Sequence, residues 1–274
     1  MAGIIISIAN HKGGTGKTTT AVNLGHALAS KCKKRVLVVD NDAQCNTTTK
    51  LIGDLKPTHS MYELLNPEGE EFNPEDFIYE TTYNENLLCI PNVQATSVLE
   101  PAMIRQSPQS FNILRKRLRE YVLKNFDIVL IDNPPNLGTF VICSLHASDF
   151  VIIPHQAGSS DSVDGLMSAL KFIYSIREDG NQDLKFLRVL VTQVDRRLTI
   201  NKAIISQIRK VLKEDQVFKT TIPGNTVFQH AELYKQTIFR FRPSAPGAAA
   251  YKDLAFELVD ILARIKEGTN GCKS

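Results

Sequence analysis

A glycine-rich stretch near the N-terminus combines glycines, lysines and threonines in a pattern suited to binding phosphate. It runs from Lys12 to Thr19 with the letters KGGTGKTT. Glycines let the backbone curl so that its N–H groups point inward around a phosphate, and a helix that begins there adds the positive end of its dipole. We therefore predict a nucleotide-binding loop made of Gly13, Gly14, Thr15, Gly16, Lys17, Thr18 and Thr19.

Three side chains of this loop have predicted roles in catalysis or metal binding. Lys17 is expected to hold the β- and γ-phosphates, and the Thr18 hydroxyl to ligate Mg²⁺. Lys12 is a second lysine in a loop whose own nucleotide already has Lys17. We predict that Lys12 reaches the nucleotide of a facing subunit and neutralises charge there in the transition state, the alternative being a general electrostatic attraction of phosphate.

Two aspartates follow apolar runs that read as buried strands. Asp42 belongs to the string Asp40-Asn41-Asp42 after the run 36–39, and Asp132 follows the run 128–131. Asp132 is expected to hold Mg²⁺ through water, and Asp42 to position or polarise the attacking water. The alternative for an aspartate after a strand is a structural role in capping a turn or a helix.

The elements that must position these residues alternate along the chain. Apolar runs predict buried strands at 4–9, 35–39, 87–90, 127–131, 150–153 and 186–191. Helical spacing predicts helices at 17–30, 60–65, 111–124, 164–177, 200–212 and 249–265. This alternation favours an α/β fold with a doubly wound, mostly parallel sheet flanked by helices, in one domain spanning 1–274, with ligands at the carboxyl ends of the strands.

Composition excludes several other classes of protein. The 274 residues are 43% hydrophobic and 22% charged, which is typical of a soluble globular chain and not of a disordered one. No apolar run is long enough to span a membrane or to act as a secretory leader, so we expect a cytoplasmic protein. The cysteines form no CxxC pair, which disfavours a disulfide framework or a zinc site, and we expect buried reduced thiols at Cys32, Cys45, Cys89, Cys143 and Cys272.

Charge is distributed unevenly along the chain although the net charge is only +3. Residues 54–100 contain one base and ten acids, and we expect the acidic part, 54–86, to be a surface excursion with a short helix. Residues 185–242 contain twelve bases and four acids. This basic segment predicts a surface for a polyanion such as DNA, the alternative being a solvated basic face; the candidate contacts are Arg196, Arg197, Lys202, Lys235, Arg240 and Arg242.

A second basic stretch lies in the predicted helix 111–124. Its basic residues are expected to form mainly the solvated side of a helix that packs on the sheet; they are Arg115, Lys116, Arg117, Arg119 and Lys124.

Four motifs in order resemble the ParA/MinD family of deviant Walker-A ATPases, and most of all its ParA (Soj-like) branch. They are KGGTGKTT at 12–19, DNDAQ at 40–44, DNPP at 132–135 and PSAPGAAAY at 243–251. The resemblance covers nearly the whole chain and implies a P-loop NTPase fold that binds ATP and Mg²⁺. It also implies a homodimer that sandwiches two ATP molecules, with Lys12 reaching across.

The resemblance further implies a cellular role. In the ParA branch the ATP dimer binds DNA without sequence preference, and a ParB-like or adaptor protein on a cargo stimulates hydrolysis. We therefore expect a nucleoid-associated ATPase that partitions or positions a plasmid, a chromosome or a protein assembly. The chain departs from the family pattern at Ala43 and Cys45, where relatives have Pro and Gly, at 158–161, at His230, and at Gly224, where relatives often carry an arginine.

Two related functions stay open as alternatives. A MinD-like positioning ATPase would need an amphipathic C-terminal tail for the membrane. Here the apolar stripe of the last helix is expected to pack on the sheet instead; it consists of Leu254, Leu258, Ile261, Leu262 and Ile265. A metabolic ligase of the same superfamily, which phosphorylates a carboxylate for amide formation, would need a substrate motif, and we find none.

Overall fold

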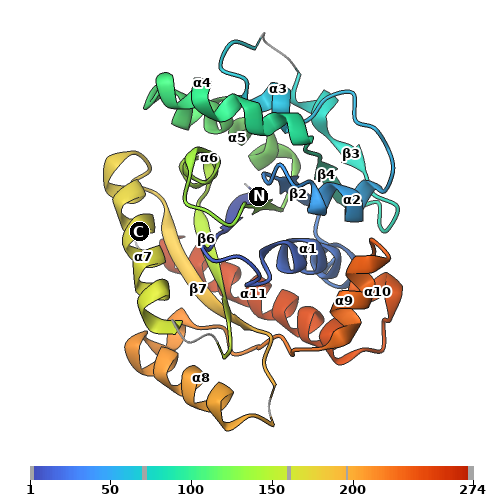
Figure 1. Ribbon diagram of the computed structural model, residues 1–274, viewed down its shortest axis with the longest axis vertical. Helices are drawn as coiled ribbons and strands as arrows, with labels where there is room; N and C mark the ends of the chain where they lie inside the picture. Colours follow the sequence, from blue (N-terminus) through green and yellow to red (C-terminus); the bar gives the residue numbers. More distant parts are fainter. Residues whose placement is uncertain (1–2, 70–72, 159–161, 196, 271–274) are drawn as a thin grey trace.

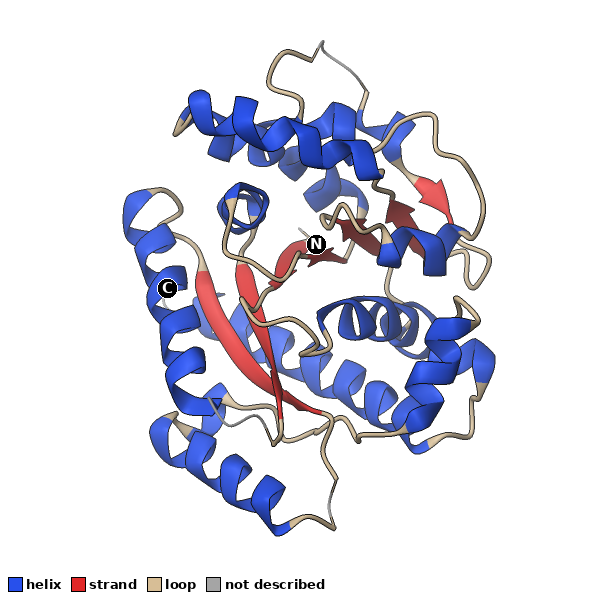
Figure 2. Ribbon diagram, in the orientation of Figure 1, coloured by secondary structure: helices blue, strands red, loops and turns tan. Residues whose placement is uncertain are grey.

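A seven-stranded sheet forms the centre of the protein in a computed structural model that describes residues 3–69, 73–158, 162–195 and 197–270 (Figures 1 and 2). The strand order is β3-β4-β2-β5-β1-β6-β7, and all neighbouring pairs are parallel except β3 with β4. The strands are β1 (Ile4–Ile8), β2 (Val36–Asp40), β3 (Tyr79–Glu80), β4 (Leu87–Ile90), β5 (Ile128–Asp132), β6 (Phe150–Gln156) and β7 (Lys185–Thr192).

The predicted strands and the mostly parallel sheet are confirmed. Each of the six predicted runs forms a strand, with ends that differ from the prediction by at most three residues. β3 was not predicted, because a strand of two residues at the sheet edge produces no alternating pattern to detect.

The long predicted helices are also present, and several short ones accompany them. The helices are α1 (Lys17–Cys32), α2 (Asn46–Ile52), α3 (Met61–Leu65), α4 (Glu100–Arg105), α5 (Ile113–Asn125), α6 (Thr139–Ala147), α7 (Ser162–Asp179), α8 (Thr199–Val211), α9 (Thr226–Leu233), α10 (Ile238–Phe241) and α11 (Pro246–Asn270). The sequence did not predict α2, α4, α6, α9 and α10, which have four to nine residues each. Helices of at most about two and a half turns give too little periodicity to recognise.

Helices cover both faces of the sheet, as Figure 2 shows. On one face α1 and α11 enclose a core with β1, β2 and β5. On the other face α3, α5, α6 and α7 pack over the same strands and over β6 and β7. The apolar stripe of α11 lies in the first core, with Leu254 and Leu258 fully buried and Ile265 half-buried, so the prediction that it packs inside is confirmed.

The acidic segment is more than the surface excursion that the sequence predicted. The predicted short helix is present as α3, where Ser60 and Glu63 form a capping box. Met61, Leu64 and Phe77 are fully buried and complete the core over β2 and β4. The prediction was wrong here because the apolar residues of this segment are few and are separated by prolines and acids.

The cysteines are less uniformly buried than expected. Cys89 and Cys143 are buried, whereas Cys32 and Cys45 are only half-buried. All four are free thiols, and Cys272 lies outside the described residues.

The arginines of α5 are not on a solvated side, contrary to expectation. Arg117 donates from its guanidinium to backbone carbonyls at the end of α3 and just after it, at Glu63, Leu64, Asn66 and Gly69. Arg115 donates to the carbonyl of His146, and Arg119 donates to the carbonyl of Ala147 and pairs with Asp149. These three cations join α5 to its neighbours, because they donate to carbonyl oxygens at helix ends and in a turn, where backbone partners are fewer.

Candidate nucleotide-binding site

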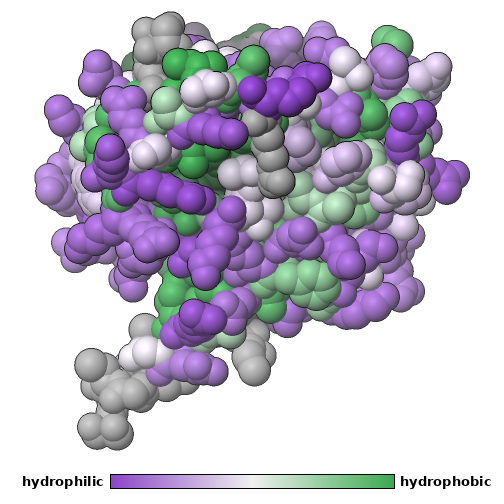
Figure 3. All heavy atoms as spheres, turned by 90° about the horizontal axis from the view of Figure 1, so that it is seen from below, coloured by the Kyte–Doolittle hydropathy of each residue, from purple (hydrophilic) through white to green (hydrophobic). Residues whose placement is uncertain are grey.

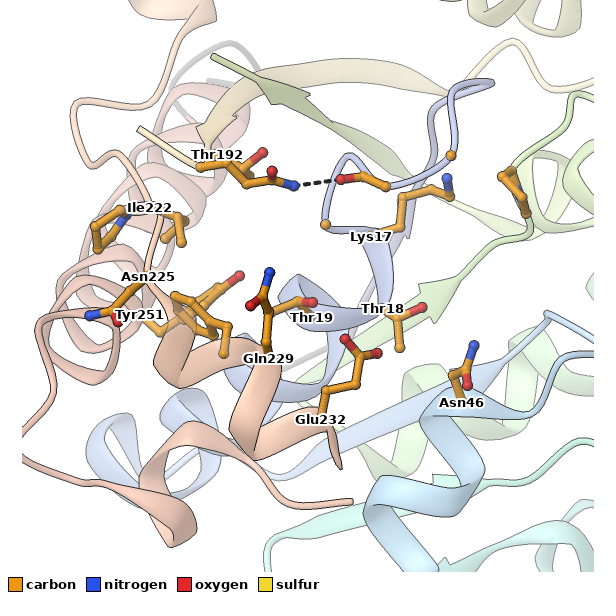
Figure 4. A pocket seen from close by; sticks show the side chains of 18 of the residues that line it. Lys17, Thr18, Thr19, Asn46, Thr192, Ile222, Asn225, Gln229, Glu232 and Tyr251 are labelled. Atoms are coloured by element: carbon orange, nitrogen blue, oxygen red, sulfur yellow. Dashed lines mark hydrogen bonds between the residues drawn. The ribbon is translucent and has the colours of Figure 1, made fainter. Parts of the chain in front are cut away.

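A cavity of about 690 Å³ opens at the carboxyl ends of the central strands (Figure 4). The predicted glycine-rich loop, the start of α1 and the segment after β2 form one side of it, and the end of β7 and α9 form the other. Of the residues predicted from sequence, the cavity wall includes Gly13, Gly14, Gly16, Lys17, Thr18, Thr19 and Asp42. A volume of this size accommodates a nucleotide.

The loop has the backbone geometry that its glycines predicted. Gly14 and Gly16 adopt φ values of 72° and 89°, a left-handed conformation that side chains disfavour. Gly16 is the N-cap of α1 and provides no side-chain hydrogen bond to the first turn. The N–H groups at the start of α1 are therefore available to an anion.

Lys17 is buried at the base of this loop, with 6% of its surface exposed. Its Nζ lies 3.0 Å from the carbonyl oxygen of Lys12, to which it donates a hydrogen bond. Burial lowers the pKa of Lys17, and the nearby carboxylates of Asp132 and Asp42 oppose that shift. Lys17 is thus a desolvated cation whose local anionic partners are the two predicted catalytic and metal-binding aspartates.

Lys12 and Thr15 occupy the outer side of the same loop. Lys12 is exposed and lines a second, smaller cavity beside His11 and His155. Thr15 is buried and does not line the nucleotide cavity; its carbonyl oxygen accepts a hydrogen bond of 2.8 Å from Thr192.

Asp132 and Asp40 lie side by side at the ends of β5 and β2, because the strand register places them opposite each other. Both are fully buried. Burial, together with the neighbouring Asp132 carboxylate, raises the pKa of Asp40 to about 7. Burial also raises the pKa of Asp132 to about 6, although hydrogen bonds from Thr47 and Thr18 oppose the shift.

The donor set around Asp132 fits a magnesium ion. Its Oδ2 accepts a hydrogen bond of 2.7 Å from Thr47, whereas Oδ1 is buried and has no hydrogen-bond partner among the described residues. A hard cation, or water bound to one, would satisfy this oxygen. The Thr18 hydroxyl is close enough to contribute to the hydrogen bonding of Asp132, so the two predicted metal-binding residues lie together.

Asp42 is half-buried at the cavity wall. Its Oδ1 accepts a 3.0 Å hydrogen bond from the backbone N–H of Gln44, and its own N–H donates to Asp40. This carboxylate therefore keeps one oxygen oriented by the backbone while the residue faces the cavity.

The structure adds residues that the sequence did not assign to the site. Thr192 and Gln193 at the end of β7 hold the loop, because the Gln193 amide donates to the carbonyl oxygen of Gly14. The opposite wall includes Asn225, whose side chain caps α9, and Tyr251 of α11. The segment 222–225 also lines the cavity, whereas only Gly224 was noted in the sequence and it was not connected with the nucleotide.

Gly224 lies close against β7. A Cβ there would meet the carbonyl oxygen of Gln193 at 3.1 Å, which is a tight contact. An arginine at this position would therefore require the backbone at Gln193 to shift.

The predicted polyanion contacts form two separate groups. Lys202 lies on α8, whereas Lys235, Arg240 and Arg242 lie on or after α9 and α10, and Figure 1 shows these helices at different corners of the molecule. All four are exposed. The face seen in Figure 3 is largely hydrophilic, with hydrophobic residues in patches.

Two of the candidate polyanion contacts have acidic neighbours. Arg197 forms a double hydrogen bond with Asp195 at 3.0 and 2.7 Å and lowers the pKa of that carboxyl to about 2. Lys235 lies 3.3 Å from Asp54. Arg196 lies outside the described residues.

Comparison with known proteins places the chain in a family. The family model described as an AAA domain matches residues 3–186. The sporulation initiation inhibitor protein Soj of Bacillus subtilis is 39% identical over 93% of this chain and 98% of its own length. The chromosome-partitioning ATPase Soj of Thermus thermophilus is 34% identical over 96% of both chains.

A solved structure with nucleotide is also similar. Cobyrinic acid a,c-diamide synthase from Mycobacterium smegmatis, with bound ATP analog and magnesium, has a TM-score of 0.78 and 28% identity over 94% of both chains. Within the described ranges, no helix has the length and apolar character needed to span a membrane. With its P-loop fold and its full-length likeness to Soj proteins, the chain belongs to the ParA/MinD family, in the Soj-like branch, and is an ATPase.

Proposed function

We propose that this ATPase binds Mg-ATP in the 690 Å³ cavity, dimerises on it, and partitions or positions a cargo on DNA. The observation that carries the proposal is the loop with two lysines in different environments. Lys17 is buried within the site and Lys12 is exposed at its outer side. In the proposed dimer, Lys17 serves the nucleotide of its own subunit, and the exposed Lys12 reaches the nucleotide of the facing subunit.

Magnesium has a defined place in this proposal. The Thr18 hydroxyl and the unpaired Oδ1 of Asp132 would hold the ion or its water. When bound, Mg²⁺ neutralises phosphate charge. Asp42, at the cavity wall, orients the attacking water, and Lys17 holds the phosphates in place.

Partition of a chromosome or a comparable cargo is proposed from the relatives. The Thermus protein is named as a chromosome-partitioning ATPase, and a chromosome partitioning protein ParA of Myxococcus xanthus is 33% identical over 94% of this chain. The exposed bases of α8 to α10 supply a surface for the DNA backbone, and a ParB-like or adaptor protein would stimulate hydrolysis. Such a protein acts in the cytoplasm, on the nucleoid.

The metabolic alternative has weaker support. The fold alone does not separate the two functions, since the diamide synthase shares it with a TM-score of 0.78. Sequence favours the partitioning function, because identity over nearly the whole chain is 39% with the Bacillus Soj protein and 28% with the synthase.

Gel filtration with and without ATP tests the dimer. We expect the unmodified chain to dimerise on ATP, and Lys12→Ala to bind ATP but to elute as a monomer and to hydrolyse slowly. Asp42→Ala should remain an ATP dimer, because the nucleotide stays uncleaved. A Lys12→Ala variant that dimerises and hydrolyses normally would refute the cross-subunit role.

A further inference from the structure

The short helix α2 holds both buried carboxylates of the site. The Thr47 hydroxyl donates to Asp132 at 2.7 Å. Thr48 donates to Asp40 twice, from its backbone N–H at 2.8 Å and from its hydroxyl at 2.6 Å. The position of α2 therefore determines how these two carboxylates are oriented toward the nucleotide.

The same helix is tied to α9 by an ion pair. Lys50 Nζ lies 3.0 Å from Glu232 Oε1. The Lys50 side chain is only 9% exposed, whereas that of Glu232 is 60% exposed. A buried ammonium without a partner is strongly unfavourable, so Lys50 keeps its place through Glu232. The Lys50 carbonyl oxygen also accepts a 2.8 Å hydrogen bond from the Tyr83 hydroxyl.

Glu232 belongs to the wall of the nucleotide cavity. Figure 4 shows its side chain rising from α9 below Thr18, with Asn46 of α2 on the far side. A carboxylate at this place would repel a bound triphosphate if its charge were not balanced. Lys50 supplies that balance and at the same time fixes the distance between α9 and α2.

We propose that Lys50 and Glu232 are a positioning pair for ATP hydrolysis. By holding α2 against α9, the pair keeps Thr47 and Thr48 in place, and these two residues orient Asp132 and Asp40. This inference rests on the magnesium site proposed above. Neither residue needs to touch the reacting atoms.

The experiment is a double-mutant cycle with Lys50→Met, Glu232→Gln and the double variant in the full chain. The main readout is the Mg²⁺ concentration that half-saturates binding of a fluorescent ATP analogue, and kcat for ATP and the melting temperature are measured beside it. We expect each single variant to raise the half-saturating Mg²⁺ concentration about tenfold, the effect found when residues that orient metal ligands are removed. The double variant should show about the same tenfold increase, because the two changes break one interaction.

A second ion pair between the same regions supplies the matched control. Asp54, two residues beyond α2, pairs with Lys235 just after α9, and both side chains are well exposed at 96% and 57%. Asp54→Asn should leave the Mg²⁺ requirement and the melting temperature unchanged. Glu232→Gln alters a largely exposed side chain, so that variant reports on the site even if Lys50→Met folds poorly.

Three results would overturn the positioning role. They are an unchanged Mg²⁺ requirement in the single variants, effects that simply add in the double variant, and a lower melting temperature without any change in Mg²⁺ requirement. If the unmodified chain binds the ATP analogue equally well with and without Mg²⁺, the magnesium site itself fails, and the positioning role falls with it.

Discussion

Two regions of the molecule carry the charges that the proposed function uses, and they differ in burial. The charges at the carboxyl ends of the central strands are buried, whereas those on α8 to α10 are exposed. Lys17, Asp40 and Asp132 are 6%, 0% and 0% exposed, and each has defined partners. Lys202 and Arg240 are exposed. A buried charge acts through fixed geometry, whereas exposed charges act by their number and are screened by salt. Single substitutions should therefore have large effects in the first region and small, cumulative effects in the second.

The α5 arginines show why the charge count of a segment does not assign it to either region. Helix α5 contains five basic residues, yet Arg115, Arg117 and Arg119 are used internally. Their partners are backbone carbonyls from distant segments, which a sequence does not identify. The distinction between the two regions therefore depends on contacts, and the following predictions test it.

The largest effect is expected at Lys17. Lys17→Ala removes the buried cation that faces the phosphates, and charge-assisted hydrogen bonds lost at this site should weaken ATP binding by at least about a hundredfold. Titration with a fluorescent ATP analogue measures it. Lys31→Ala, an exposed position in the last turn of α1, should bind normally. Equal affinity of both variants would contradict the assignment of the loop.

Arg117→Met should destabilise the fold although the residue belongs to a basic stretch. It removes the guanidinium that donates to four backbone carbonyls, which should lower the free energy of unfolding by about 2–4 kcal/mol. Urea denaturation measures this change. Lys116→Met, at the exposed neighbouring position, should change it by less than about 0.5 kcal/mol. If the two variants have the same free energy of unfolding, Arg117 acts as an ordinary surface charge and does not hold α5 to its neighbours.

Magnesium binding should weaken in acid. The pKa of Asp132 is raised to about 6 by burial, so below that pH the carboxyl is protonated in the folded chain and must lose its proton to meet a cation. The half-saturating Mg²⁺ concentration should be nearly constant above pH 7 and rise by up to about tenfold per pH unit below 6. Titrations at several pH values, corrected for the affinity of free ATP for Mg²⁺, measure it.

The exposed region should not share this pH dependence. Asp195, whose pKa Arg197 lowers to about 2, remains ionised over the same range. A constant Mg²⁺ requirement between pH 5 and 8 would exclude Asp132 as the titrating ligand.

The smallest effect is expected on α8. Lys202→Gln, Arg209→Gln and Lys210→Gln should each change the free energy of unfolding by less than about 0.5 kcal/mol. A dimer that neutralises about six phosphates should show a slope near −5 for log DNA affinity against log salt. Each lost phosphate contact should make that slope shallower by about 0.9, as measured by fluorescence anisotropy. An unchanged slope in all three variants would leave the residues near α9 and α10 as the DNA surface.

The sequence predicted the parts of the site that lie in local motifs or at strand ends. The loop from Gly13 to Thr19 is contiguous, and Asp132 follows a run of apolar residues that is recognisable as a buried strand. Because parallel strands end at one edge, the meeting of Asp132 with the loop followed from the fold class.

Contacts between residues far apart in the chain could not be predicted. The pair Lys50 and Glu232 spans 182 positions, and Gln193 reaches a loop 179 residues away. In both contacts, the residue types do not indicate which residue the side chain will meet. The short helices α2 and α9, which place Lys50 and Glu232, carry too little periodicity to be recognised, so the wall of the cavity opposite the glycine-rich loop was not identified.

The register between β2 and β5 has a consequence for how the cavity opens. Asp40 and Asp132 lie opposite each other at the ends of β2 and β5, two paired strands in the middle of the sheet, so separating them means breaking the backbone hydrogen bonds between these strands. The facing wall, α9, is joined to α2 by the side-chain ion pair of Lys50 and Glu232. Bound nucleotide should therefore leave when α9 moves away from α2. In hydrogen–deuterium exchange, the amides of α9 should exchange long before those of β2 and β5.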